Sequence, residues 1–402
     1  MTNLFIQERE RKFDPLQLVA LVLLMVIGTM FVYSATLANA SSTLAWYNQS
    51  WARQVIWYAL GLGAAAVVCL TDYHVLARWS FIAYWGTIVC LVAVLIPHIG
   101  TTHGWGARRW IDLGPFQFQP SEFAKLAFIP AAANFLSRPV DELQQRAVFW
   151  KGIGMIMLPF VLILKEPDLG SALVLLPTGL VMMYVAGTPL KYLVRLAAIV
   201  GVLGGLLLAN ILFAPPSWQI KMQEYQRQRL LVYFGANFAH AGATSQEKAE
   251  ARRLQLEKSY QVRQALISVG SGGWLGKGWC KGDQTALGFL PPGAAHNDFI
   301  FSVIAEEEGF AGSILVLVLY AVVLFTGLRI AGQARDRLGK LVAVGVVTLL
   351  FSHVFINIGM NIRIVPVTGI PLPLLSYGGS SVLCSLIALG LMQNVHIHRR
   401  GY

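Results

Sequence analysis

Charged residues are scarce in this chain. Asp, Glu, Lys and Arg make up 13% of its 402 residues, whereas hydrophobic residues make up 56% and the mean hydropathy is +0.59. An ordinary soluble domain carries about 25% charged residues, so this chain has too little polar surface for a water-soluble protein of its size. The composition therefore excludes a soluble enzyme, a nucleic-acid-binding protein and a disordered scaffold, and it predicts a polytopic membrane protein.

Cysteine is also rare, with four residues in the whole chain. Three of them lie in apolar runs and Cys280 stands alone in a loop, so the sequence predicts no disulfide framework. The net charge of +11 does not require a nucleic-acid partner, because basic residues of membrane proteins collect in cytoplasmic loops that face anionic lipid. We therefore expect membrane lipid as the partner of these charges.

Nine apolar runs approach the roughly 20 residues that a membrane-spanning helix needs. They are Leu16–Thr36, Val55–Leu70, Phe81–Pro97, Ile153–Leu164, Leu169–Ala186, Tyr192–Phe213, Phe310–Leu328, Leu341–Ile358 and Leu374–Met392. The first lacks a small-residue cleavage site after it, so we expect a retained helix rather than a signal peptide.

A tenth span is expected at Ser121–Leu136, which is shorter and carries Glu122 and Lys125 in its first turn. With this span included, most basic residues of the short loops fall on the same side as both termini, as the positive-inside rule requires. Without it, every later basic loop falls on the wrong side. The sequence thus predicts an all-α protein with ten transmembrane helices, both termini in the cytoplasm and residues 1–402 forming one integral membrane domain.

Residues 214–297, between the seventh and eighth spans, are predicted to form one large extracytoplasmic loop. A stretch of mixed apolar and basic residues from Trp218 to Phe234 is typical of a helix that lies on a membrane surface. Thr244–Glu247 reads as a capping box that opens a charged helix through Lys258. A glycine-rich return, Gly270–Gly278, then leads back to the membrane.

Charges within or beside spans are energetically costly, so each is a functional candidate. In this chain nearly all of them fall on the outer side, in Gly104–Lys125, Lys165–Asp168, Asn297–Glu308 and Asn357–Arg363. The ten-span topology brings these four segments to the same face. We therefore expect them to line one cavity there.

Basic residues of these segments suit a pyrophosphate or another anionic headgroup, because charge-assisted hydrogen bonds are strong where water is scarce. The candidates are Arg108, Arg109, Lys125 and Arg363, together with Lys277, whose glycine neighbours would let a phosphate approach the backbone. Glu122, one turn before Lys125, is a further substrate-binding candidate. Most of these residues have a plainer alternative. Arg108 and Arg109 would serve as interfacial anchors, Glu122 and Lys125 would form a helical i,i+3 pair, and Lys277 would belong to a flexible turn.

Asp298 follows a Pro-Pro-Gly turn and opens a long helix. One interpretation is that it caps the helix N-terminus. The other is that its carboxylate faces the cavity and takes a proton from an alcohol. Glu306 and Glu307, two turns further on, need basic partners, and we expect Arg363 or Lys125 in that role.

No metal site is predicted from His103 or His296, because neither has a partner at the i,i+4 spacing of a zinc-binding helix.

Five motifs occur in the order found in the shape, elongation, division and sporulation family, which the chain resembles over nearly its whole length. They are Ala107–Lys125, Glu166–Ala172, Gly270–Gly278, Asn297–Gly309 and Ile370–Ser381. The stretches GPFQFQPSE and Tyr225–Arg229 look more like the family's RodA branch than its FtsW branch.

The resemblance implies a peptidoglycan glycosyltransferase that polymerises lipid II into glycan at the outer face of the cytoplasmic membrane during cell elongation. It implies undecaprenyl-linked glycan as the second substrate and a class B penicillin-binding transpeptidase as partner. The family's essential aspartate falls on Asp298, and the basic residues of its motif fall on Arg108, Arg109 and Lys125. A divalent cation such as Mg²⁺ stays open as a cofactor.

Two rival functions remain open beside the one that the resemblance implies, a lipid II flippase and a non-catalytic scaffold that recruits the transpeptidase. Transporters place their binding groups near the bilayer midplane, whereas the charges here gather at the outer mouth, which favours catalysis. The chain also departs from the family pattern. Leu290–Asp298 is two residues longer and lacks a glutamate, and about Gly242–Lys258 looks like an insertion.

Overall fold

The computed structural model describes residues 13–37, 46–97, 99–101, 108–112, 114, 117–213, 224–235, 245–290 and 292–400. Parts of the expectations above fall outside these ranges. They are the surface-helix residues Trp218 and Ile220, the capping residue Thr244, and His103.

Within the described residues, nine helices are long and apolar enough to cross a membrane. They are α1 (Pro15–Leu37), α2 (Ser50–Leu70), α3 (Tyr73–Leu95), α6 (Arg146–Lys165), α7 (Leu169–Ala186), α8 (Leu190–Phe213), α13 (Ile300–Gln333), α14 (Arg337–Asn361) and α15 (Gly379–Ile397). All nine predicted spans are confirmed as helices, most of them longer than the apolar run alone. The last begins at Gly379 rather than Leu374, because Leu374 has a φ of 65° and belongs to an irregular segment before the helix.

The shorter tenth helix is α4 (Pro120–Leu136), which opens with a proline in its first turn, where the missing N–H costs nothing. It contacts α3, α7 and α14, and most of its residues are buried. Its charged residues, Glu122 and Lys125, therefore lie inside the bundle. These charges make the mean hydropathy of α4 the lowest of the ten helices. The all-α, polytopic architecture is confirmed.

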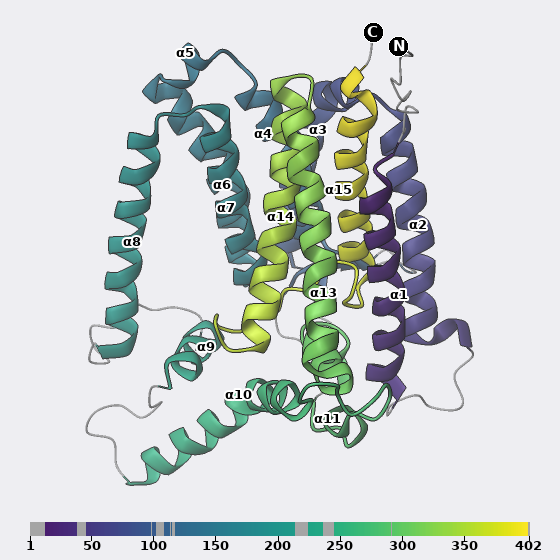
Figure 1. The fold of residues 1–402 in the computed structure, drawn as a ribbon. Helices are drawn as coiled ribbons and strands as arrows, with labels where there is room; N and C mark the ends of the chain where they lie inside the picture. The colour runs from purple at the N-terminus through teal and green to yellow at the C-terminus, as the bar shows by residue number, and fades with distance from the viewer. Residues whose placement is uncertain are drawn as a thin grey trace, which may run out of the picture.

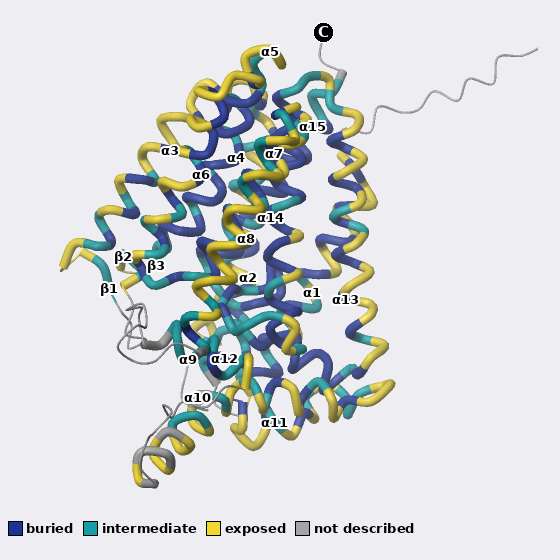
Figure 2. Tube along the Cα trace, turned by 90° about the vertical axis from the view of Figure 1, so that its left-hand side faces the viewer, coloured by how far each residue is buried: buried dark blue, intermediate teal, exposed yellow. Residues whose placement is uncertain are grey.

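The long helices run side by side, with α14 at the centre against α13, α7 and α4, and with α15 against α2 (Figure 1). Exposed residues follow the outward faces of the bundle and buried ones its interior (Figure 2). The beginning of α1 and the end of α15 share one end of the bundle (Figure 1). Helices α9 (Glu224–Phe234), α10 (Ser245–Ser271) and α11 (Asp283–Ala286) lie at the opposite end, and α8 stands apart from the other spans.

A small antiparallel sheet between α3 and α4 is the one departure from an all-helical fold in the described part of the chain. Its strands are β1 (Gly100–Thr101), β2 (Trp110–Asp112) and β3 (Gln117–Phe118), in the order β1-β2-β3. The backbone N–H of Arg109 donates to the carbonyl of Thr101 at 3.4 Å. The sheet thus holds Arg109 in place just before β2. The remaining short elements are α5 (Val140–Leu143), α12 (Pro292–Ala295) and the 3₁₀ turns Trp46–Asn48 and His398–Arg400.

Helix α13 is broken at Gly309, whose φ of 65° and ψ of −157° are not helical. The glycine-rich segment after α10 fills the break. Lys277 N–H donates to the Glu306 carbonyl at 3.0 Å, and Phe310 N–H donates to the Gly273 carbonyl at 2.8 Å. A Cβ added to Gly272 would lie 1.9 Å from the Ala305 carbonyl oxygen, so the close approach of the two backbones requires glycine.

Candidate functional site

Asp298 lies two residues before α13, and its carboxylate is not used to cap that helix. The N-cap position is Phe299, which makes no side-chain capping bond, so the capping interpretation is wrong. The main chain is held instead, because the Asp298 carbonyl accepts hydrogen bonds from the side-chain amides of Asn357 at 3.0 Å and Asn361 at 3.1 Å. Asn357 also donates to the carbonyl of Ile370 at 2.7 Å. These bonds fix the main chain of Asp298 and leave its carboxylate available to a ligand.

Two cavities, of about 960 and 590 Å³, meet at Asp298. Five residues line both of them, namely Arg109, Trp110, Asn297, Asp298 and Gly369. The wall between the cavities therefore carries one carboxylate and one guanidinium. A molecule in either cavity would reach Asp298.

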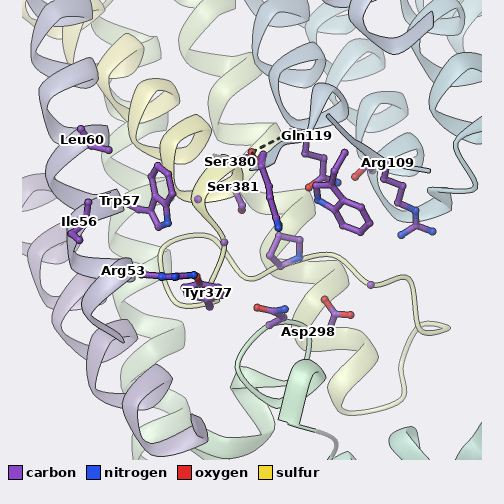
Figure 3. A pocket seen from close by; sticks show the side chains of 18 of the residues that line it. Arg53, Ile56, Trp57, Leu60, Arg109, Gln119, Asp298, Tyr377, Ser380 and Ser381 are labelled. Atoms are coloured by element: carbon purple, nitrogen blue, oxygen red, sulfur yellow. Dashed lines mark hydrogen bonds between the residues drawn. The ribbon is translucent and has the colours of Figure 1, made fainter. Parts of the chain in front are cut away.

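The first cavity changes from polar to apolar across its width. Arg109 and Asp298 lie on one side, and Ile56, Trp57 and Leu60 of α2 lie along the other (Figure 3). Ile56 and Leu60 are 48% and 52% exposed, although both belong to a span. This cavity suits an amphipathic ligand with a charged head and a long apolar chain, because its apolar wall lies on the outer face of the bundle.

Arg229 of α9 reaches the same wall from beyond the ends of the spans. Its Nη1 donates to the carbonyl of Thr368 at 3.2 Å. A Cβ added to Gly369 would lie 3.4 Å from Asp298 Oδ2 and 3.9 Å from Arg229 Nη2, so the two side chains flank this glycine. Burial raises the pKa of Asp298 to about 6, while the positive charges of Arg229 and Arg109 lower it and Asp168 raises it further. The carboxylate is thus a base with its pKa near neutral pH.

The guanidinium of Arg109 is positioned by backbone carbonyls rather than by an acid. Its Nε donates to the Glu166 carbonyl at 3.3 Å and its Nη2 to the carbonyl of Pro167. The Glu166 side chain is fully buried and has no hydrogen-bond partner within the described structure. Burial, followed by the charge of Asp168 and against that of Arg109, raises the pKa of Glu166 to about 9. Glu166 is therefore neutral at pH 7, and the charge of Arg109 stays available to a ligand.

Lys125 and Glu122 do not line either cavity. Lys125 Nζ lies 2.7 Å from Glu122 Oε1 and 3.0 Å from His353 Nε2, and the lysine is 1% exposed. The i,i+3 pair expected as the alternative is confirmed. The expectation that Lys125 reaches the cavity of Asp298 is wrong, because the first turn of α4 points this side chain into the bundle.

Lys277 and the glutamates of α13 form a separate cluster. Lys277 Nζ lies 2.7 Å from Glu306 Oε1 and 2.9 Å from Asp283 Oδ2. Glu307 accepts from the Ser34 hydroxyl and from the backbone N–H of Cys280 at 3.0 Å. The prediction that Arg363 or Lys125 partners these glutamates is wrong. The glycine segment that fills the break in α13 places Lys277 beside Glu306 instead.

Arg363 lines the second cavity, where its Nη2 donates to the carbonyls of Val232 at 3.3 Å and Tyr233 at 3.5 Å. Arg108 is exposed and lines neither cavity. Of the candidates, the structure thus gathers Asp298, Arg109 and Arg363, and it adds Arg229. The one signal for Arg229 in the sequence is the motif Tyr225–Arg229, which ends on it.

The donor set offers little to a metal ion. The described residues hold no group of three or more His, Cys, Asp or Glu side chains that would bind one. His296 packs its ring against Tyr377, with centroids 5.3 Å apart. A divalent cation at this site would find Asp298 as the one carboxylate among the described lining residues of the two cavities.

Comparison with known proteins gives a consistent result over the full length. The family model of FtsW, RodA and SpoVE cell cycle proteins matches residues 15–401. Peptidoglycan glycosyltransferase MrdB of Escherichia coli K12 is 33% identical over 389 residues, which cover 96% of this chain and 94% of MrdB. Stage V sporulation protein E of Bacillus subtilis 168 is 35% identical over 391 residues, covering 96% of this chain and 98% of the relative.

Two solved structures have the same fold. One is a chain from work on the structural coordination of polymerization and crosslinking by a peptidoglycan synthase complex, with a TM-score of 0.73, 28% identity, and coverage of 97% of this chain and 99% of that chain. The other is the rod shape determining protein RodA of Thermus thermophilus, with a TM-score of 0.63, 26% identity, and coverage of 97% and 98%.

Proposed function

Since the chain belongs to the FtsW, RodA and SpoVE family, we propose that this peptidoglycan glycosyltransferase polymerises lipid II, with Asp298 as the general base. The single observation that carries the proposal is the position of Asp298 in the wall shared by two cavities. A polymerase must hold two saccharides at once, a donor and an acceptor. One cavity for each, with a carboxylate between them, meets that requirement.

The reaction is a transfer with inversion at the donor sugar. The 4-hydroxyl oxygen of the acceptor forms a bond to the anomeric carbon of the lipid-linked donor, and the bond from that carbon to the pyrophosphate oxygen breaks. Asp298 takes the hydroxyl proton, and the lipid pyrophosphate leaves with the bonding electron pair. A base with a pKa of about 6 is largely deprotonated at neutral pH and remains strong enough to accept this proton.

Negative charge builds up on the departing pyrophosphate, and arginine is the side chain best suited to bind it. Arg109 lines both cavities together with Asp298, and Arg229 lines the second, so both arginines lie at the proposed reaction centre. A cation such as Mg²⁺ would supplement the positive charge of these arginines, but the residues present offer it one carboxylate, and no step of the proposed mechanism depends on it.

The apolar wall of the first cavity supports a lipid-linked substrate. A polyprenyl chain would run along Ile56, Trp57 and Leu60 into the membrane while its headgroup stays near Asp298. We place the cavities on the outer side of the cytoplasmic membrane. Basic residues at the opposite end of the bundle, such as Arg138, favour a cytoplasmic location for that end.

The cellular setting follows from the relatives. MrdB and RodA are peptidoglycan glycosyltransferases, and one structural neighbour comes from a complex that coordinates polymerization with crosslinking. We propose that this chain works in cell elongation beside a class B penicillin-binding transpeptidase.

The flippase alternative needs a polar path through the bundle. Beyond the cavities, α14 occupies the centre of the bundle, and 83% of the residues in its most apolar stretch are buried. A non-catalytic scaffold would not need a carboxylate and two arginines around paired cavities. Both observations favour polymerisation.

The test uses purified full-length protein, labelled lipid II and electrophoresis of the glycan products. We expect strands from the wild type and none from Asp298→Asn. Strand synthesis by Asp298→Asn at the wild-type rate would show that Asp298 is not the general base. Headgroup transport in liposomes without polymer would establish the flippase, and inactivity in both assays, with transpeptidase binding retained, would establish the scaffold.

A further inference from the structure

A third cavity, of about 320 Å³, is lined by residues of α9 and α10 and by Arg363. These two helices lie beyond the ends of the spans (Figure 1). It shares Val232, Val262 and Arg363 with the second cavity, so the two cavities are neighbours. The mechanism above does not use it. A ligand held at Asp298 through the second cavity would be able to extend into it.

Helix α10 turns one face toward this cavity. Arg252, Leu256, Ser259, Arg263 and Leu266 line it, at spacings of four and three residues that return to the same side of a helix. Arg252 and Arg263 are thus three turns apart on one stripe. The neighbouring Arg253 is exposed but does not line the cavity, because one residue turns the helix by about 100°.

The cavity is strongly basic. Three arginines line it, Arg252 and Arg263 from α10 and Arg363 from the segment after α14, and no acidic side chain is among its described lining residues. The acidic residues of the same helix with described side chains, Glu250 and Glu257, fall about 140–160° around the helix from Arg252. Such an arrangement attracts an anion and offers guanidinium groups for paired hydrogen bonds to a carboxylate.

We propose that this cavity binds a carboxylate at the end of the peptide carried by the saccharide substrate. The inference rests on the proposed function and names a further substrate-binding site for it. The pyrophosphate is attached to the reacting sugar and must therefore stay near Asp298, Arg109 and Arg229. Lipid II carries a pentapeptide, which reaches up to about 17 Å when extended. In this proposal it leaves the reaction centre through the second cavity and ends among these arginines.

The size of the cavity favours a peptide end over a partner protein. A volume of about 320 Å³ holds one or two residues, and the three lining residues shared with the second cavity place it next to the substrate. An acidic segment of another protein would have to enter from the outside. Arg363 lines both the second and the third cavity and is already held by two backbone carbonyls. Arg252 and Arg263 line the third cavity and not the second, so substituting them tests the third cavity separately.

The experiment compares the double variant Arg252→Gln/Arg263→Gln with the wild type and with the matched control Arg253→Gln. Each full-length enzyme is given two lipid II substrates, one with the free peptide carboxylates and one with the peptide removed. Because exposed ion pairs are individually weak, each arginine is expected to change KM roughly two- to fivefold. We expect the double variant to raise KM for the peptide-bearing substrate about tenfold, with kcat unchanged and with no effect on the peptide-free substrate.

Arg253→Gln should match the wild type with both substrates, and all three proteins should share one melting temperature. An equal KM increase with the peptide-free substrate, or no increase with either, would overturn the inference. So would a defect that arises only when a transpeptidase is present, because the occupant would then be an acidic segment of that protein. Absence of polymer from the wild type with both substrates would instead overturn the proposed function.

Discussion

Asp14 and Asp298 are carboxylates at opposite ends of the bundle, each placed just before a long helix. Asp14 is 1% exposed; its Oδ1 accepts hydrogen bonds from the N–H groups of Leu16 and Gln17, and its Oδ2 pairs with Arg329. No hydrogen bond or ion pair within the described structure occupies the carboxylate of Asp298, which lines two cavities. A helix start alone therefore does not identify a capping residue, and only the surroundings separate a structural carboxylate from a reactive one.

The two ends of the bundle also differ in backbone conformation. Four non-glycine residues have positive φ among the described residues, and all lie in connecting segments around the cavity end, namely Pro167, Cys280, Arg363 and Leu374. Such conformations cost about 1–3 kcal/mol each and persist where neighbouring structure imposes them. Near the termini the polar groups are paired instead, as where Tyr73 donates to Asp336 at 2.6 Å.

The largest effect should come from exchanging each aspartate. Asp298→Asn removes the base and should lower the polymerisation rate by about 10²–10⁴-fold at an unchanged melting temperature. Asp14→Ala loses a helix cap and an ion pair, which should cost about 1–3 kcal/mol of stability while the folded protein keeps its specific activity. Product gels and thermal melts in detergent measure both. Equal loss of activity in the two variants would erase the distinction.

Arg109→Gln should lower kcat by about 10²-fold, because a preorganised charge at the departing pyrophosphate is lost. The matched control is Arg138→Gln at the opposite end, where the arginine stacks 4.3 Å from the Phe135 ring centroid and lies 3.7 Å from Glu142. We expect the control to keep the wild-type kcat. A kcat for Arg109→Gln within threefold of the wild type would exclude Arg109 from the chemistry.

Two neighbouring glycines at the cavity end are expected to differ in their effect on stability. Gly272→Ala would force a Cβ against the Ala305 carbonyl and should destabilise the protein by at least about 2 kcal/mol. Gly270→Ala adds a Cβ with no atom within 4 Å in a helical position, so it should leave stability unchanged or raise it by up to about 1 kcal/mol. Melting temperatures decide; equal values would mean that the glycine segment does not pack closely into the break of α13.

The smallest effect on activity is expected from Lys277→Met. Lys277 pairs with the buried Glu306 and lines neither cavity of Asp298. Its loss leaves a buried carboxylate without its cation, so the substitution should lower stability by about 1–3 kcal/mol and leave KM and kcat unchanged. A rise in KM without a change in melting temperature would return this lysine to the substrate site.

The spans were predictable because the length of an apolar run is a local property of the chain. Asp298 and Arg109 were found through the polar segments and the family motifs that contain them. Sequence alone places Lys125 and Lys277 at the cavity, because a charge near a helix end gives the same pattern whether it faces a cavity or forms an ion pair within the protein.

The remaining features depend on distant contacts. Arg229 was missed as a site residue because only the packing of α9 over Gly369 brings it to Asp298. The sheet was missed because strands of two or three residues are too short to show a periodic pattern.

The pH dependence of kcat/KM shows whether Asp298 is the base, with Arg229→Gln as the comparison. A base with a pKa of about 6 is active when deprotonated, so activity should rise as the pH rises through about 6 and level off above it. The positive charge of Arg229 lowers the pKa of Asp298, so its removal should move the midpoint to higher pH. A profile that is flat from about pH 5 to 8, or a midpoint that moves to lower pH in Arg229→Gln, would contradict the assignment of Asp298 as the base.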